Sequence, residues 1–285
     1  MNKKVGIGIV TCNRPKFLRG LLKSLKPCLK NEDCPIAEWV IVNDGEAQDK
    51  PSEALCATWI NNTKNIGVAK SKNKILKHLL DKNCDYMFIL EDDVEIIDKN
   101  IFAAYIKAHE LSGIHHFNYG PGSPFNLKQT NIQNYDLHNR HLLDHDTEPN
   151  PKMLLQYSSD CEIALYEHTV AMFSFFTSTC IKKVGFFPEE YSNCWEHVDH
   201  TYQIIKAKLH PPFWWFADVA NSHKMLRVAD EAIQESSIAK DNHQWMKNVM
   251  EGREIYKTKH GHYPNQPPFS SKEEVLECIK NLKQK

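Results

Sequence analysis

The most distinctive hydrophobic pattern in this chain is an apolar run that ends at three consecutive acids. Residues 87–90 are Met-Phe-Ile-Leu, which is typical of a buried strand, and Glu91, Asp92 and Asp93 follow directly. Carboxylates at the end of a buried strand are costly unless a cation neutralises them. Oxygen ligands suit Mg²⁺ or Mn²⁺, and such ions keep coordination positions for substrate phosphates. The alternative interpretation of this stretch alone is a solvated acidic loop.

Before this run, apolar segments with the pattern of strands alternate with segments whose apolar residues recur at helical spacing. The expected strands cover residues 5–11, 39–42 and 57–60, and the expected helices begin at Pro15, at Val68 and, beyond the acids, at about Lys99. Strands that alternate with helices at this spacing form a parallel sheet with helices on both faces, and ligands bind at the carboxyl ends of its strands. Thr11, Asp44 and the three acids all lie at such ends.

The second half of the chain is less regular. The segment 120–151 is rich in Pro, Asn, Gly, Asp and His and is too long for an ordinary connection, so it is expected to be a binding loop or an insertion. Residues 224–240 show no clear core face. Further strands are expected at 153–157, 162–166, 170–176 and 213–216, and helices at 177–184, 195–209, 241–257 and from Ser271.

Composition narrows the class of protein. A chain of 285 residues can form one large domain or a domain with an appendage, and a net charge of −1 gives no electrostatic case for nucleic acid or an anionic membrane. Nine cysteines without C-x-x-C spacing argue against a zinc ribbon and indicate reduced thiols and a cytoplasmic location. The basic, then apolar N-terminus is broken by glycines and predicts a strand, not a signal peptide. No apolar run approaches the length of about 18 residues that a membrane span needs.

Five segments between Val5 and His223 occur in an order that one enzyme family shares. They are VTCNRPKFLRGLLKSL, WVIVNDGE, NIGVAKSKNKIL, ILEDDVEI and the pair STCIKKVGFFPEEY and WEHVDHTYQI. In this order they resemble the GT-A glycosyltransferases, in particular the large inverting family of bacterial transferases called family two. ILEDDVEI is similar to the DxD metal motif of these enzymes, in the EDD form found in N-acetylglucosaminyltransferase I.

The resemblance implies a fold class and a domain organisation. The fold is expected to be α/β, with the GT-A (Rossmann-like), mostly parallel sheet flanked by helices and with a helical C-terminal extension. Residues 1–223 would form the glycosyltransferase domain, in which 1–112 bind the nucleotide sugar and 113–223, with the insertion 120–151, bind the acceptor. Residues 224–285 would form the extension and a lid that orders over the bound donor.

The resemblance also implies a metal site. Asp93 would bind the metal ion directly, while Asp92 and Glu91 would bind the ribose or metal-bound water, with Asp92 also counted among the metal ligands. His223 would complete the site, and a neutral imidazole suits Mn²⁺ better than Mg²⁺. The alternative for His223 is a capped or surface histidine.

Further donor-binding residues are expected at the other strand ends. Asp44 would recognise the nucleobase by accepting a hydrogen bond from an imide N–H of uracil or thymine, although Asn-Asp-Gly is also a turn signal. Thr11 would contact the base or ribose and Arg14 a phosphate, with helix capping and a surface charge as the alternatives. Asn65 and Asn73 match the family pattern of asparagine, glycine and asparagine.

The catalytic base is open to three interpretations. In inverting relatives an acid pair opens the acceptor-side helix and its second member takes the proton, but here the pair reads Glu196-His197. Glu196, which is preferred, His197 or, in another register, Asp199 would serve as the base. A capping role for this acidic helix start is the alternative without catalysis.

Three other groups of residues have a structural interpretation beside a functional one. The four lysines of helix 68–80 are expected to form a solvated face, although one near its start would be able to meet the diphosphate. The tryptophans near 195 and 214 are expected in the core or in a sugar-stacking platform, and the histidines of segment 115–145 in a polar insertion and not at a metal. The members are Lys70, Lys72, Lys74 and Lys77; Trp195, Trp214 and Trp215; and His115, His116, His138, His141 and His145.

The predicted function is a metal-dependent glycosyltransfer. A sugar would move from a nucleotide-diphosphate sugar, foremost a UDP-sugar, to an acceptor hydroxyl with Mn²⁺ or Mg²⁺ as cofactor, by inversion unless the altered base position allows retention. The acceptor stays open among glycan, lipid-linked glycan, protein and modified nucleic acid. The rival classes are a metal-dependent hydrolase, a carbohydrate-binding module, and a nucleotidyltransferase, which would need a glycine-rich loop where this chain has TCNRPKFLRG.

Overall fold

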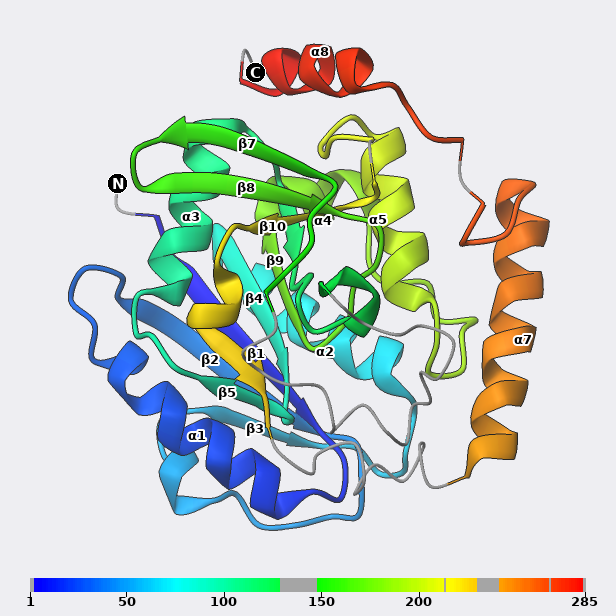
Figure 1. Ribbon diagram of the computed structural model, residues 1–285. Helices are drawn as coiled ribbons and strands as arrows, with labels where there is room; N and C mark the ends of the chain where they lie inside the picture. The colour runs from blue at the N-terminus through cyan, green and yellow to red at the C-terminus, as the bar shows by residue number, and fades with distance from the viewer. Residues whose placement is uncertain (1–2, 129–147, 213, 230–240, 267, 284–285) are drawn as a thin grey trace.

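A six-stranded mixed sheet forms the centre of the computed structural model, which describes residues 3–128, 148–212, 214–229, 241–266 and 268–283 (Figure 1). The strand order is β3-β2-β1-β4-β9-β6. The first four strands in the chain are parallel, β9 runs antiparallel to β4, and β6 runs antiparallel to β9. These strands are β1 (Val5–Thr11), β2 (Ile36–Asn43), β3 (Thr58–Asn61), β4 (Tyr86–Glu91), β6 (His116–Asn118) and β9 (Phe173–Thr177).

Helices cover both faces of this sheet, as the continuous apolar strands predict. Side chains alternate between the faces: Ile7 and Ile9 lie in one cluster of buried residues, and Val10 lies in the other. The first cluster includes helices α1 (Pro15–Leu29) and α3 (Ile101–Ser112). The second includes α2 (Val68–Asp81), α4 (Ser178–Val184) and α5 (Glu196–Lys206).

Two glycines in β1 let helix α2 approach the sheet closely. A Cβ atom placed on Gly8 would lie 1.9 Å from Cγ2 of Ile75, and one on Gly6 would lie 2.7 Å from Cδ2 of Leu79. The glycine spacing of the first strand therefore sets how near α2 lies to the carboxyl ends of the central strands.

Two smaller sheets flank the central one. One has the order β10-β8-β7, and the other pairs β5 with β11 in antiparallel fashion. The prediction of a strand at 213–216 was wrong in its bounds, because Trp214 and Trp215 have φ angles of +52° and +59° and the strand begins at Phe216. The bounds are β5 (Val94–Ile96), β7 (Met153–Ser158), β8 (Cys161–Tyr166), β10 (Phe216–Val219) and β11 (Leu226–Val228), with short 3₁₀ turns at η1 (Ser52–Ala54), η2 (Pro124–Asn126) and η5 (Ser222–Lys224).

Parts of three predictions lie outside the described residues. Of the predicted lid, residues 224–240, the described part 224–229 includes β11, which pairs with β5, while 230–240 are not described. Of the predicted insertion, residues 129–147 are not described, and these include His138, His141 and His145. Phe213, the first residue of the predicted strand, also lies outside.

The C-terminal extension packs on the rest of the fold through two helices (Figure 1). Helix α7 (Asn242–His260) buries Tyr256 in a cluster with Trp215 and Tyr166. Helix α8 (Lys272–Leu282) begins with a capping box between Ser271 and Glu274 and adds buried apolar side chains to the cluster under α1 and α3. Within the described ranges, none of the helices is long and apolar enough to cross a membrane.

Candidate active site

The carboxyl ends of β1 and β4 hold an acidic cluster that a guanidinium partly neutralises. Oγ1 of Thr11 donates a hydrogen bond to Oδ2 of Asp92 over 2.7 Å, and the Arg14 guanidinium pairs with Asp92. Nη1 of Arg14 also lies 3.5 Å from Oδ2 of Asp93. The structure thus brings together Thr11, Arg14, Asp92 and Asp93, which the sequence placed at the donor side. With the adjacent Glu91, we call these five residues the donor edge.

Burial and neighbouring charges act together on the groups of the donor edge. Burial raises the pKa of Asp92 to about 7, although the Arg14 guanidinium opposes this effect, and the charge of Asp93 adds to it. Burial lowers the pKa of Arg14, but the carboxylates of Asp93 and Asp92 outweigh burial and raise it above its ordinary value. Arg14 is therefore charged and bound to both acids, while burial makes the charged form of Asp92 costly.

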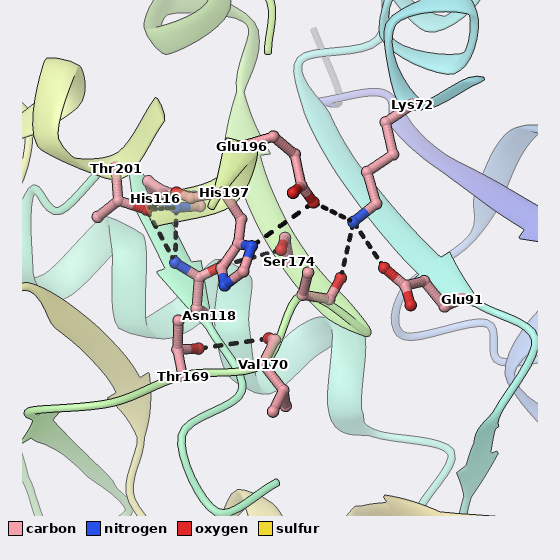
Figure 2. Close-up of polar contacts among 11 residues, drawn as sticks. Lys72, Glu91, His116, Asn118, Thr169, Val170, Ser174, Glu196, His197 and Thr201 are labelled. Carbon is pink, nitrogen blue, oxygen red and sulfur yellow. Dashed lines mark hydrogen bonds and ion pairs between the residues drawn. The ribbon is translucent and has the colours of Figure 1, made fainter. Parts of the chain in front are cut away.

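Lys72 joins the donor edge to the start of helix α5. Its side chain is only 1% exposed, and its Nζ lies 2.6 Å from Oε1 of Glu91 and 3.6 Å from Oε1 of Glu196 (Figure 2). The same ammonium donates a hydrogen bond to the carbonyl oxygen of Ala171 over 3.2 Å. Burial lowers the pKa of Lys72, but Glu91 and Glu196 outweigh it and raise that pKa. Lys72 is thus a buried cation held between two carboxylates from distant parts of the chain.

The predicted role of Lys72 did not include this contact between two carboxylates, although the sequence carries a signal for it. Lys70, Lys74 and Lys77 are exposed, as predicted, but Lys72 lies on the buried face of α2 with Ile75. A lysine at helical spacing from buried apolar residues requires a carboxylate partner, because an isolated charge in the core is very costly. The position on the apolar stripe could therefore have identified it.

Glu196 and His197 form the acceptor-side part of the site. Nδ1 of His197 lies 3.5 Å from Oε1 of Glu196, while Oε2 of Glu196 is buried without a hydrogen-bond partner among the described residues. Burial raises the pKa of Glu196, but His197 and Lys72 outweigh it and lower that pKa to about 2. Glu196 is consequently ionised at neutral pH and is only 2% exposed.

A buried polar network fixes the position of helix α5 behind these two residues. Nδ2 of Asn118 donates to Oγ1 of Thr201 over 3.1 Å, and Nε2 of His116 lies 3.0 Å from the same oxygen (Figure 2). Oγ of Ser174 donates to Oδ1 of Asn118 over 2.9 Å. Burial lowers the pKa of His116 well below its usual range, so the network is neutral. It anchors α5 to strands β6 and β9.

Asp199 belongs to a different network from Glu196. Its carboxylate accepts hydrogen bonds from Oη of Tyr191 at 2.7 Å, Nε2 of Gln203 at 2.7 Å and Nζ of Lys259 at 2.8 Å, and it lies 2.9 Å from Nε2 of His260. Burial raises the pKa of Asp199, but these partners, led by Lys259, lower it overall. The structure uses Asp199 to fasten α7 to α5.

Asp44 organises the loop in front of helix α2. Its Oδ1 accepts from Nδ2 of Asn62 at 2.7 Å and from the backbone N–H of Ile66 at 2.8 Å, and its Oδ2 accepts from that of Gly67 at 2.9 Å. Oδ1 of Asn65 accepts from the Gly67 N–H at 3.1 Å. Asp44 and Asn65 therefore share a loop whose geometry they set, and contact with a nucleobase stays a prediction.

Two further predicted site residues, Asn73 and His223, have other neighbours. Asn73 bonds to the backbone of Phe187, with Nδ2 to its oxygen and Oδ1 to its nitrogen, both at 2.9 Å, and so links α2 to the turn before α5. His223 lies in η5, where burial lowers its pKa and the carboxylate of Glu148 opposes that effect. In the part of the chain that the structure describes, no group of three or more His, Cys, Asp or Glu side chains is arranged to hold a metal.

A cavity of about 680 Å³ opens beside His197, and we call it the aromatic pocket. Helix α7 contributes Trp245, which the sequence analysis did not single out. Of the three tryptophans that it did consider, Trp195 and Trp215 line the pocket, whereas Trp214 packs on Phe269 with ring centroids 5.1 Å apart. The aromatic lining consists of Phe125, His168, Trp195, His197, Trp215, Phe216, Trp245 and Phe269.

Comparison with known proteins gives relatives of one enzyme class. No family model matches the chain. It is 28% identical over 259 residues to "Uncharacterized glycosyltransferase R363" of Acanthamoeba polyphaga mimivirus, across 84% of this chain and 86% of that protein.

Solved structures share the fold at low sequence identity. S. aureus TarS 1–349 in complex with UDP-GlcNAc matches with a TM-score of 0.55 at 13% identity, covering 98% of this chain and 72% of that one. The mannosyltransferase PcManGT from Pyrobaculum calidifontis, in complex with GDP-Man and Mn²⁺, matches with a TM-score of 0.55 at 11% identity, covering 99% and 70%. The α/β fold prediction is confirmed, and the named relatives bear out the prediction of a glycosyltransferase enzyme.

Proposed function

We propose that this chain transfers a sugar from a nucleotide-diphosphate sugar, bound at the donor edge, to an acceptor hydroxyl held in the aromatic pocket. The observation that carries the proposal is the buried Lys72, which connects Glu91 of the donor edge to Glu196. Donor and acceptor sides are thereby parts of one site, as a transfer between two substrates requires.

A uridine nucleotide is the proposed donor carrier. TarS, which shares the fold, was solved with UDP-GlcNAc, and PcManGT was solved with GDP-Man, so both nucleotides belong in the test. The strand ends that hold Thr11, Asp44 and Glu91 lie next to one another, because β1 pairs with both β2 and β4. This is the edge at which α/β sheets bind nucleotides.

Asp92 and Asp93 fit a divalent cation such as Mn²⁺ or Mg²⁺. Asp92 and Asp93 follow the end of β4 side by side, and both contact the guanidinium of Arg14. Two hard carboxylates and a substrate diphosphate are a common ligand set for these ions. When bound, the ion would act as a Lewis acid toward the departing diphosphate. The ligand role of His223 stays a prediction, and the proposed site is built on Asp92 and Asp93 alone.

His197 is the proposed base, and Glu196 orients it. Asp199 is held by four partners, and the carboxylate of Glu196 already lies close to the ammonium of Lys72 and the imidazole of His197. His197 lines the aromatic pocket and directs Nδ1 toward Glu196, which leaves Nε2 for the acceptor hydroxyl. The ionised Glu196 would stabilise the imidazolium that forms. Attack by the deprotonated hydroxyl on the anomeric carbon, from the face opposite the leaving diphosphate, inverts the configuration.

The test is a screen of nucleotide release from UDP- and GDP-sugars, with Mn²⁺, Mg²⁺ or EDTA present. We expect release from a UDP-sugar that needs a divalent ion, and its loss in Asp93→Asn. Glu95→Gln is the matched control, because Glu95 is an exposed acid two residues away that pairs with Arg227. Absence of release from every donor, together with unchanged melting temperature on adding UDP and Mn²⁺, would overturn the proposal. Full activity of the Asp93→Asn variant would contradict the proposed metal site.

The geometry does not favour the alternative of a metal-dependent hydrolase. Such a site would need Asp92 and Asp93 with His197, Asp199 and His223. Asp199 instead holds α7, and the carboxylate that acts on the pKa of His223 is Glu148.

A further inference from the structure

We infer that the aromatic pocket binds an uncharged sugar ring of a glycan acceptor, with Trp245 of helix α7 as one wall. This inference rests on the proposed function and specifies the acceptor class of the same site. A sugar ring has apolar C–H faces and a polar rim of hydroxyls, so it matches a pocket with aromatic walls and a proton acceptor at one end.

The charges around the pocket favour a neutral occupant. Among the described residues that line it, none is lysine or arginine, and the single acid is Glu167. The carboxylate of Glu167 lies 3.2 Å from Nζ of Lys152, so its charge already has a counter-ion. A phosphorylated or otherwise anionic acceptor would find no cationic partner in this lining, and its desolvation would be costly.

The size and the polar groups of the pocket suit a sugar. Its volume of about 680 Å³ lies within the usual range of small-ligand pockets. Thr169, Asn193 and Asn265 line it and supply hydroxyl and amide groups, while His197 places the proposed base at the wall. An acceptor hydroxyl would reach His197 with its ring stacked on an indole face.

Helix α7 is fixed in a position where it completes the pocket. Nε1 of Trp195 donates to the carbonyl oxygen of Val249 over 3.0 Å, and Asp199 holds Lys259 and His260 at the other end of the helix. Gly252 allows the close approach, since a Cβ there would lie 2.7 Å from Cδ1 of Trp195. The C-terminal extension is therefore part of the acceptor site in this inference.

The experiment measures sugar transfer by the full chain to two acceptor panels, using the donor found in the release screen. The neutral panel holds methyl glucoside, methyl galactoside, lactose and cellobiose, and the anionic panel holds glucose 6-phosphate and ribitol 5-phosphate. We expect products with the neutral panel alone, detected by mass spectrometry. Transfer confined to the anionic panel, or to neither, would overturn the inference.

Variants of one helix make the test specific. Trp245→Ala should raise the acceptor KM about tenfold, which corresponds to the loss of one aromatic contact. Trp245→Phe should restore most of the affinity. Met250→Ala on the same helix is the control, because Met250 is exposed and does not line the pocket. Phe269→Ala provides a second wall variant if Trp245→Ala does not fold.

The outcomes separate the two proposals. Nucleotide release without transfer to neutral sugars contradicts the acceptor class alone. Absence of nucleotide release contradicts the proposed function. An acceptor KM that is the same in wild type and in both the Trp245→Ala and Phe269→Ala variants overturns the role of the pocket.

Discussion

The donor edge and the aromatic pocket are built in opposite ways. The donor edge consists of charged side chains at the ends of neighbouring strands, and sheet pairing alone brings them together. The pocket consists mainly of uncharged and aromatic side chains from η2, α5, β10, α7 and the loops between them, and it is complete only when α7 is docked. The difference teaches that the donor side depends on charge balance and the acceptor side on packing. Lys72 is where the two meet.

Removing that link should have the largest effect. Lys72→Met leaves Glu91 and Glu196 as buried carboxylates without their shared cation, so we expect unfolding to become easier by about 3–5 kcal/mol and transfer to be lost. Urea unfolding and product formation measure the two effects. Lys70→Met is the control, because Lys70 is exposed on the same helix. A Lys72→Met protein with wild-type stability and transfer would show that the two sides are independent.

Removing the proposed base should impair the transfer to the acceptor and spare the donor side. We expect His197→Ala to lower the rate of transfer about 100-fold or more, while nucleotide release without acceptor persists. Added imidazole should restore part of the transfer rate. The opposite pattern, with His197→Ala active and Glu196→Gln inactive, would assign the base to Glu196.

Loosening α7 should have a smaller effect, confined to the pocket. Asp199→Asn weakens the bonds to Lys259 and His260, so we expect a loss of about 1–3 kcal/mol in unfolding free energy and a higher acceptor KM. The donor KM should stay unchanged. Glu190→Gln is the control, since Glu190 is an exposed partner of the same lysine. Equal changes in both KM values would contradict the separation of the two sides.

Lowering the pH should reduce the stability of the acceptor side first. This is the smallest of the expected effects. Burial lowers the pKa of His200 and of His210 to about 4, and both pack around His116 near α5. The unfolded chain binds these protons near the ordinary histidine pKa of about 6.5, so stability falls as the pH drops from about 6.5 toward 4. At pH 5.5 each histidine should cost about 1 kcal/mol.

Urea unfolding at several pH values checks the acid effect. His200→Gln should make stability less dependent on pH in this window. Hydrogen exchange should show faster opening of α5 than of β1 at pH 5.5. Uniform opening of both elements would contradict the prediction.

Local patterns predicted the neighbouring strand ends well because their geometry follows from periodicity. The apolar run before Glu91 and the strand ending at Thr11 specify a parallel pair, and Thr11 does contact Asp92. The contacts of helix α5 could not be predicted in this way because they join distant segments. Asp199 lies one helical turn from Glu196, yet partners on α7 decide its role. Trp245 has no local signal of the pocket that it completes.

Gly8 places no side chain between strand β1 and helix α2, so Ile75 of the helix packs directly on the backbone of the strand. An added Cβ would lie 1.9 Å from Cγ2 and 3.0 Å from Cβ of Ile75, so a rotation of that side chain relieves only part of the overlap. Ile75 is one turn from Lys72 on the buried face of α2. The absence of a Cβ atom at Gly8 therefore determines where α2 places the Lys72 ammonium between Glu91 and Glu196. A substitution at Gly8, although far from either substrate, would change that position.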